Sequence, residues 1–218
     1  MSYPIAPKHM FNYRSSIIKN FGYDTKTAVE YRFNDLGYRS DIEFIVGQKP
    51  VIILGNTISF GLGVDIKDTF TNMLASHLKK PVYNFSWGCY AHTNYEQLQL
   101  LRSIIETDNP SLIIFQINNL NRYRKNNTVC FDNPTELIIK EYEKFYTEIS
   151  KLLKNKRHIF LHWDNQEHNV NLPNCLIKNR FLIDCNINIE DRTVGGIKSH
   201  KLIGLKIIKE IEEQKIYE

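Results

Sequence analysis

Short apolar runs alternate with longer amphipathic stretches along most of this chain. Each run is uncharged and is followed by a polar residue or glycine, which predicts five buried strands at residues 51–54, 82–85, 112–117, 159–161 and 181–183. Between and after them, apolar residues recur at the spacing of a helix. The four helical stripes consist of Phe70, Met73, Leu74 and Leu78; Leu98, Leu101 and Ile105; Ile138, Tyr142, Phe145, Ile149 and Leu152; and Ile203, Ile207 and Ile211.

This alternation predicts an α/β fold with a parallel sheet, because parallel strands are joined by crossovers that are usually helical. Ligands of such sheets bind beyond the carboxyl ends of the strands. The loops to inspect are therefore 55–64, 86–94, 118–132, 162–179 and 184–196. Since no internal repeat or low-complexity linker interrupts the chain, we expect one domain over 1–218, with 1–50 as an approach segment and 51–214 as the core.

Composition narrows the function classes. The 28 Lys and Arg residues and 24 Asp and Glu residues give a net charge of +4 without a basic stripe, so we expect no nucleic-acid partner. No apolar run approaches the roughly 18 residues of a membrane span, so we expect no membrane association. The oligomeric state stays open. The cysteines lack Cys-x-x-Cys spacing, which favours reduced thiols in a cytoplasmic protein; they are Cys89, Cys130, Cys175 and Cys185.

The first predicted strand leads into a turn rich in glycine and small polar residues. From Gly55 it reads Gly-Asn-Thr-Ile-Ser-Phe-Gly-Leu-Gly, the kind of junction that presents a nucleophile at the edge of a sheet. The segment resembles the first block of the SGNH (GDSL-type) hydrolases, Gly-Asp-Ser-x-Thr-x-Gly. In this resemblance Asn56 stands at the Asp position and Thr57 at the position of the nucleophilic Ser. Residues 31–39 are similar to the family's Asn-x-x-Gly-Phe-Arg approach segment.

Three later segments resemble further blocks of this family. Gly88, in Asn-Phe-Ser-Trp-Gly, takes the position of a glycine whose amide helps to form the oxyanion hole. Asn118, in Phe-Gln-Ile-Asn-Asn, best matches the oxyanion donor of the family's Gly-x-Asn-Asp. The run Asp-Arg-Thr-Val-Gly-Gly-Ile-Lys-Ser-His aligns without a gap to Asp-x-x-His-Pro-Gly-x-x-Ser-His. It places Asp191 at the acid position, Val194 at the general-base position and His200 at the second His.

The resemblance implies a three-layer α/β/α sandwich around a five-stranded parallel sheet, flavodoxin-like in strand order. It implies a relative of enzymes that hydrolyse acyl esters on carbohydrate or lipid, without a metal or a cofactor. Threonine keeps a hydroxyl, but Val194 cannot accept a proton. We therefore expect an incomplete catalytic triad, with Thr57 and Asp191 in place and with weak or no esterase activity.

Alternatives to a degenerate esterase stay open. A relocated base would support an acyl hydrolase or acyl transferase. The candidates for this base are His162 after the fourth strand, His92 in the loop that contains Gly88, and His200. Cys89 beside His92 would supply another nucleophile. A pocket that binds a carbohydrate or acyl ligand without turnover would instead make the chain a binding or scaffold module. We expect no metal site, because His162, Asp164 and His168 lack the spacing of a ligand set.

Overall fold

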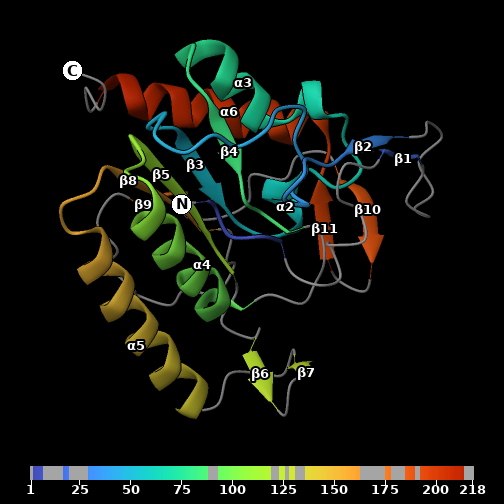
Figure 1. The fold of residues 1–218 in the computed structure, drawn as a ribbon. Coiled ribbons are helices and arrows are strands. Elements are labelled where there is room, and N and C mark those ends of the chain that lie inside the picture. Colours follow the sequence, from blue (N-terminus) through green and yellow to red (C-terminus); the bar gives the residue numbers. More distant parts are fainter. Residues whose placement is uncertain are drawn as a thin grey trace.

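A computed structural model describes residues 2–6, 17–19, 29–87, 93–118, 123–125, 128–130, 136–162, 175–177, 185–189 and 192–213. Within these ranges the central sheet has five strands, β3 (Val51–Leu54), β4 (Val82–Asn84), β5 (Leu112–Ile117), β8 (His158–His162) and β9 (Cys175–Ile177). Their order is β4-β3-β5-β8-β9, and every neighbouring pair is parallel (Figure 1). The first strand of this sheet, β3, is an inner strand. The chain continues to the edge strand β4 and then crosses back to β5 on the other side of β3. This confirms the flavodoxin-like order.

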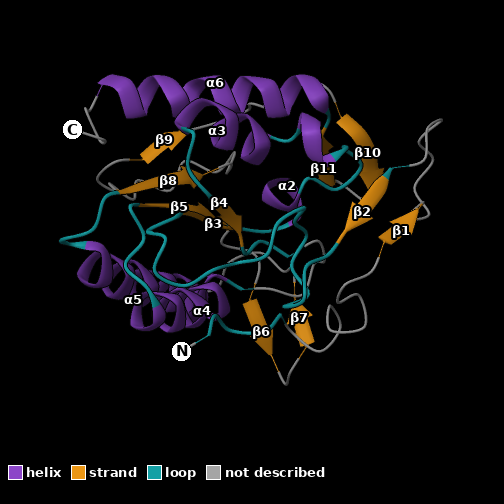
Figure 2. Ribbon diagram, turned by 45° about the horizontal axis from the view of Figure 1, so that its top comes forward, coloured by secondary structure: helices purple, strands orange, loops and turns teal. Residues whose placement is uncertain are grey.

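Helices cover both faces of the sheet, which confirms the α/β/α sandwich (Figure 2). One face carries α3 (Phe70–Leu78) and α6 (Ile197–Glu213). The opposite face carries α4 (Asn94–Thr107) and α5 (Glu136–Leu153). The N-terminal caps of α3 and α4 are threonines, Thr69 and Thr93, and Thr93 completes a capping box with Glu96.

Strand β3 shows why the strand sequences are apolar without interruption. Val51 and Ile53 pack into the cluster under α3 and α6, whereas Ile52 and Leu54 pack into the cluster under α4 and α5. All four side chains are fully buried. A strand that is buried on both faces needs apolar residues at odd and even positions, so it shows no alternation with polar residues.

The fifth strand lies elsewhere than predicted. Strand β9 is Cys175–Ile177, which pairs with Phe160 and Leu161 of β8. The predicted run, residues 181–183, lies outside the described residues. Cys-Leu-Ile and Phe-Leu-Ile are equally apolar triplets, and three residues are too few for periodicity to choose between them. The choice is made by pairing with β8, which is a long-range contact.

Three antiparallel ribbons flank the sandwich within the described ranges, and the periodicity of the sequence does not predict them. They are β1 (Ile17–Lys19) with β2 (Glu30–Arg32), β6 (Tyr123–Lys125) with β7 (Thr128–Cys130), and β10 (Cys185–Ile189) with β11 (Arg192–Gly195). The last ribbon matters for the site, because the backbone of β11 packs against the short helix α2 (Thr57–Phe60) that follows β3 (Figure 1).

The N-terminal segment is anchored to the sandwich by a buried tyrosine. The Tyr3 ring packs against Phe44, Tyr83 and Phe85, and its exposed fraction is 2%. The Tyr3 hydroxyl donates to Oδ2 of Asp108, which also accepts from the Gly47 N–H at 2.9 Å. Burial raises the pKa of the Asp108 carboxyl, but donation from Tyr3, Gly47 and Asn109 outweighs burial, and the pKa is lowered from its ordinary value.

A pH-dependent loss of stability follows from Asp108. Because its pKa is lowered in the folded state, its contribution to the free energy of unfolding is present above its unfolded pKa and is lost as the pH falls through the folded pKa. We expect Asp108→Asn to cost about 1 kcal/mol at pH 7 and the two proteins to converge as the pH falls below the folded pKa of Asp108, as measured by urea unfolding at several pH values. Tyr3→Phe, which removes one donor, should show the same trend. A difference between parent and Asp108→Asn that stays constant with pH would contradict this account.

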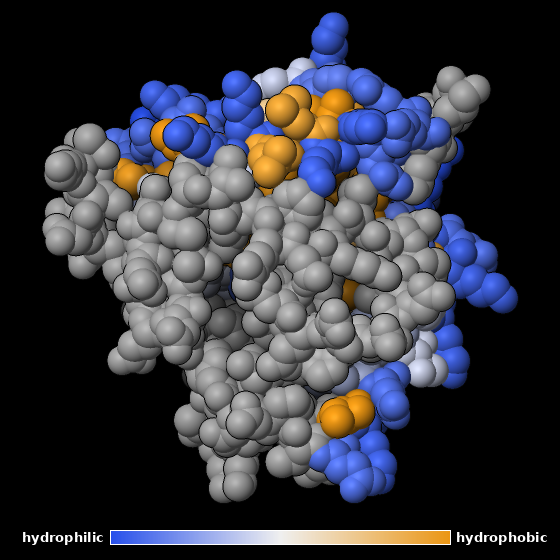
Figure 3. Space-filling model, turned by 180° about the vertical axis from the view of Figure 1, so that it is seen from behind, coloured by the Kyte–Doolittle hydropathy of each residue, from blue (hydrophilic) through white to orange (hydrophobic). Residues whose placement is uncertain are grey.

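None of the helices in the described part of the chain has both the length and the apolar character that crossing a bilayer requires. On the face seen in Figure 3, apolar side chains form small groups among hydrophilic ones. Among the described residues, the exposed large apolar side chains are spread over the N-terminal segment, the loop before β3 and the helices α4, α5 and α6; they are Ile5, Ile42, Ile45, Tyr95, Ile139, Ile197 and Leu205.

Candidate active site

The segment that follows β3 forms a strand–turn–helix junction at the carboxyl edge of the sheet. Gly55 continues the strand, Asn56 caps α2 with extended backbone angles (φ −112°, ψ −151°), and Thr57 is the first residue of the helix. Gly61 ends the helix in the left-handed region at φ 77° and ψ 42°, which favours glycine. The local geometry therefore matches the strand–turn–helix junction expected from the sequence, with Thr57 at the start of the helix. Residues 55–61 are called the nucleophile turn below, after the family block that they resemble.

Thr57 itself is poorly placed for nucleophilic attack in the free protein. Its exposed fraction is 5%, and its Oγ1 atom is buried without a hydrogen-bond partner among the described residues. A hydroxyl becomes an effective nucleophile only when a nearby base takes its proton. Within the described part of the chain, no group is in position to do so.

A chain of side-chain amides lies beside Thr57 and joins β3 to β5. Asn56 Oδ1 accepts from the Ile58 N–H at 3.2 Å and from Nε2 of Gln116 at 2.5 Å. Asn56 Nδ2 donates to Oδ1 of Asn118. Gln116 is fully buried and Asn118 has an exposed fraction of 1%. The three amides hold the nucleophile turn against the end of the neighbouring strand.

Ser59, the other hydroxyl of the turn, has a structural role. Its side chain is fully buried, and its Oγ donates to Oε1 of Gln116 at 2.5 Å. The Ser59 carbonyl accepts from Nδ2 of Asn84 at 2.7 Å, which ties α2 to the edge strand β4. These contacts fix the first turn of the helix. They leave Thr57 as the hydroxyl that matches the nucleophile position.

Asn118 is held at its backbone by residues from the two helices of the opposite face. Its N–H donates to Oδ1 of Asn94 at 2.7 Å, and its carbonyl accepts from Nδ2 of the same residue at 3.1 Å. The Tyr142 hydroxyl also donates to this carbonyl. Asn94 thus bonds the backbone of Asn118 as a neighbouring strand would, and the end of β5 becomes a rigid platform.

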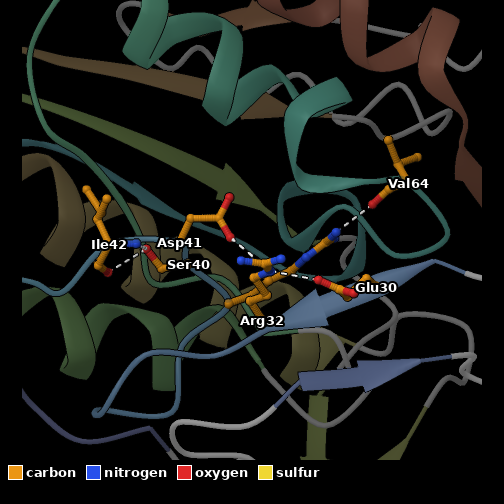
Figure 4. A network of polar contacts seen from close by, with 7 residues as sticks. Glu30, Arg32, Ser40, Asp41, Ile42 and Val64 are labelled. Carbon is orange, nitrogen blue, oxygen red and sulfur yellow. Dashed lines mark hydrogen bonds and ion pairs between the residues drawn. The ribbon is translucent and has the colours of Figure 1, made fainter.

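Arg39 organises the far end of α2. Its guanidinium donates to the carbonyls of Phe60 at 3.0 Å, Gly61 at 2.5 Å and Val64 at 2.5 Å. Figure 4 shows the Val64 carbonyl with its hydrogen bond. Its Cζ atom lies 4.4 Å from the centre of the Tyr31 ring. Burial lowers the pKa of Arg39 to about 10, so the group stays charged at neutral pH. The approach segment of the sequence therefore supplies the cation that orders the loop after the nucleophile turn.

Of the three histidines considered as a relocated base, the structure describes the side chain of His200 alone. It is fully buried and stacks on Phe70, and its Nδ1 accepts from the Phe70 N–H at 3.3 Å. That contact caps α3 and gives His200 a structural role. His162 is the last residue of β8 and lies opposite Ile117 in the register, at the carboxyl edge of the sheet. Its side chain, like all of His92, lies outside the described residues.

The remaining predicted site residues are located only in part. Gly88 and Asp191 lie outside the described residues. Val194 lies in β11, opposite Ile187 of β10, in the strand whose backbone packs against α2. The strand that holds Val194 is thus brought close to the nucleophile turn, as the resemblance implies. The side-chain geometry at Val194 is not part of the described structure.

Gln116 forms four hydrogen bonds with Asn56 and Ser59 of the nucleophile turn, yet no motif of the sequence marks it as a site residue. Its only signal is a polar residue inside an otherwise apolar strand, Leu-Ile-Ile-Phe-Gln-Ile. A buried amide must find partners, so such a residue marks a specific polar contact. The pattern does not reveal which residues supply that contact.

The chain is similar to several solved structures named as esterases or lipolytic proteins. A protein from Desulfitobacterium hafniense DCB-2, placed in the G-D-S-L family of lipolytic proteins, is 15% identical over 74% of this chain and 98% of its own, with a TM-score of 0.48. The psychrotrophic esterase EstA from Pseudoalteromonas sp. is 14% identical over 76% and 98%, with a TM-score of 0.47. A carbohydrate esterase family 2 enzyme from Corynascus thermopiles (Myceliophthora fergusii) is 13% identical over 79% and 68%, with a TM-score of 0.45. No protein-family model and no curated protein matches the sequence.

Proposed function

We propose that this chain is a protein of the SGNH hydrolase type whose site binds an acyl ester of a carbohydrate or lipid and turns it over weakly or not at all. The observation that carries the proposal is the state of Thr57. Its hydroxyl lies at the tip of a nucleophile turn, yet it is buried and donates to none of the described residues. The turn resembles the first block of the hydrolases, but none of the described residues is in position to activate the hydroxyl that it presents.

Three features support weak turnover. Productive attack on an ester requires Thr57 to become accessible, since its exposed fraction is 5% in the free protein. The methyl group of threonine also restricts χ1 and crowds the path of an incoming carbonyl carbon. The family's base position is Val194, whose side chain has no titratable group. Loss of the base from a catalytic triad costs several orders of magnitude in rate.

Hydrolysis of a short-chain aryl ester tests this proposal. We expect the parent protein to hydrolyse p-nitrophenyl acetate at most slowly, and Thr57→Ala to abolish whatever rate exceeds the buffer. Thr57→Ser, which removes the crowding methyl group, should raise the rate by no more than about tenfold, because Val194 still occupies the family's base position.

A parent rate typical of efficient esterases, near 10 per second or above, would contradict weak turnover. A rate that Thr57→Ala leaves unchanged would exclude Thr57 as the nucleophile.

A binding or scaffold module is the second candidate, and the amide chain favours it. Asn56, Gln116 and Asn118 are uncharged and linked to one another, an arrangement that recognises a ligand through hydrogen bonds without proton transfer. Binding without turnover would appear as a rise in the thermal unfolding midpoint with an acetylated sugar such as N-acetylglucosamine. If no ester is hydrolysed, and neither acetylated sugars nor short-chain esters raise the thermal unfolding midpoint, both candidate functions are contradicted.

A further inference from the structure

A pocket lies along the free edge of the sheet, beside the edge strand β4. Its volume is about 120 Å³, and its walls come from β4, from residues 39–42 and from α3. A cavity of about 150 Å³ is large enough for a benzene molecule, so this pocket can hold a fragment the size of one residue. The pocket includes Phe60 at the far end of α2, whereas Thr57 does not line it.

The backbone of β4 directs one set of its polar groups into this pocket. Toward β3, the Pro81 carbonyl accepts from the Val51 N–H at 2.9 Å, and the Phe85 N–H donates to a carbonyl of β3 at 2.8 Å. Backbone groups of successive residues alternate in direction along a strand. Those of Val82 and Asn84, which lie opposite β3 residues in the register, therefore face away from β3. Both residues line the pocket.

These outward backbone groups are buried but unpaired. Val82 and Asn84 have exposed fractions of 5% and 8%, and their outward N–H and C=O groups bond to none of the described residues. Buried backbone groups in folded proteins nearly always have a partner. Nε of Arg39, in the wall of the pocket, is also buried without an acceptor in the part of the chain that the structure describes. The pocket thus presents both donors and acceptors to a ligand.

The spacing of these groups matches an extended peptide. One residue of an extended chain presents its N–H and its C=O on the same side, so it can donate to the Val82 carbonyl and accept from the Asn84 N–H, as a parallel strand does. In an acetamido group the N–H and C=O of one trans amide point in opposite directions. An N-acetylated sugar would therefore satisfy the donor or the acceptor, but not both. Added peptide strands bind free sheet edges in this manner.

The mouth of the pocket carries an excess of negative charge. Asp41 lines it, and its side chain is 48% exposed. Arg32 lies 4.0 Å from Asp41 and bonds to Glu30 at 2.7 Å, so two carboxylates flank one guanidinium and one negative charge is left over (Figure 4). The buried guanidinium of Arg39 is directed to backbone carbonyls instead. A basic side chain at the mouth is favoured over an acidic one.

We propose that this pocket binds an extended, basic peptide segment of a partner protein, which pairs with Val82 and Asn84 as an additional strand of the sheet. The sheet of a second copy fits less well, because residues 39–42 and α3 flank an edge strand of only three residues. The peptide site goes beyond the proposed ester-binding site and does not depend on Thr57.

Amide proton signals of ¹⁵N-valine-labelled protein test the pairing without any requirement for turnover. The probe is acetyl-Lys-Val-Lys-Val-Lys-amide, and the signals of Val82 and Val51 are assigned by their loss in Val82→Ile and Val51→Ile. We expect the Val82 amide proton to move downfield on titration, because it gains an acceptor. Val51 already donates to Pro81 and should stay in place. A Val82 signal that is unmoved by millimolar peptide, or that moves together with Val51, would overturn the proposal.

Two control peptides separate backbone pairing from charge. N-methylation of the central residues of the probe removes their N–H donors and should abolish the shift of Val82. Exchange of Lys for Glu should weaken binding at low salt and less so at high salt, where charges are screened. Equal binding of the N-methylated probe would exclude strand pairing, and equal binding of the acidic probe would exclude selection for a basic segment.

Filling the pocket tests its location. Ala75 lines the pocket from α3, whereas the neighbouring Ser76 is exposed and does not. We expect Ala75→Leu to weaken binding of the probe by about tenfold or more, and Ser76→Leu to leave it unchanged. Equal affinity of the parent and Ala75→Leu would overturn the site. A Val82 shift produced by N-acetylglucosamine but not by the probe, or by raising the protein concentration alone, would assign the edge to a sugar or to a second copy and overturn the peptide.

Discussion

Replacing Arg39 with methionine is expected to lower the free energy of unfolding by about 3 kcal/mol or more. Arg39 is 3% exposed, and its guanidinium donates to three backbone carbonyls at the end of α2 and in the loop that follows. Methionine keeps much of the packing volume but no donor. The carbonyls of Phe60, Gly61 and Val64 would then be left without this partner, at a cost of about 1–3 kcal/mol for each buried group that finds no replacement.

Arg32→Met is the matched control for this prediction. Arg32 lies seven residues earlier and bonds to Glu30 at 2.7 Å, but its side chain is 56% exposed (Figure 4). An exposed ion pair contributes roughly 0–1 kcal/mol, so this variant should be close to the parent. Urea unfolding monitored by circular dichroism measures both. Equal losses in the two variants would mean that the carbonyl contacts of Arg39 do not stabilise the loop.

The second large effect is expected at Gly55, where any side chain would collide with the amide chain. A Cβ atom at this position would lie 2.5 Å from Oγ of Ser59 and 2.6 Å from Oε1 of Gln116. Neither atom can retreat easily, because both belong to the hydrogen bonds that hold α2 against β5. We expect Gly55→Ala to cost about 2–3 kcal/mol, in the range for overpacking of a buried site.

Gly204→Ala provides the contrast. A Cβ atom there would lie 3.0 Å from Sδ and 3.1 Å from Cε of Met73, a flexible side chain that can move aside. Alanine is also preferred over glycine inside a helix by about 1 kcal/mol. We therefore expect a change within about 1 kcal/mol, measured by the same urea unfolding. If Gly55→Ala lowered the free energy of unfolding as little as Gly204→Ala does, this result would contradict the close packing described at the nucleophile turn.

Together these positions explain how the chain builds its turn. Gly55 allows Gln116 to approach the start of α2, and Arg39 holds the carbonyls at its end. A helix of four residues has little stability of its own, since nucleation of the first turn is unfavourable. The geometry of Thr57 is therefore imposed by residues that are distant in sequence, namely Gln116 from β5 and Arg39 from the approach segment.

The sequence by itself determined the architecture of this protein. Strands that are buried on both faces must be apolar at every position, and helices that cover them must carry one apolar stripe. For that reason the sequence pattern locates several elements correctly. Examples are the strands at 51–54 and 112–117 and the helix from Phe70 to Leu78. The order of strands and helices then selects a doubly wound parallel sheet. The edge at which Asn56, Thr57 and Asn118 gather follows from the same rule.

Only the tertiary structure decided which polar groups meet at that edge. Gln116 and Asn56 are sixty residues apart, and no local pattern links them. The same is true of the contact between His200 and Phe70, which gives that histidine a capping role, and of the pairing that selects Cys175–Ile177 as the fifth strand. Hydrophobic periodicity reports which side of an element is buried. Hydrogen bonds between side chains depend on distances of a few tenths of an ångström, which are set when the packed layers come together.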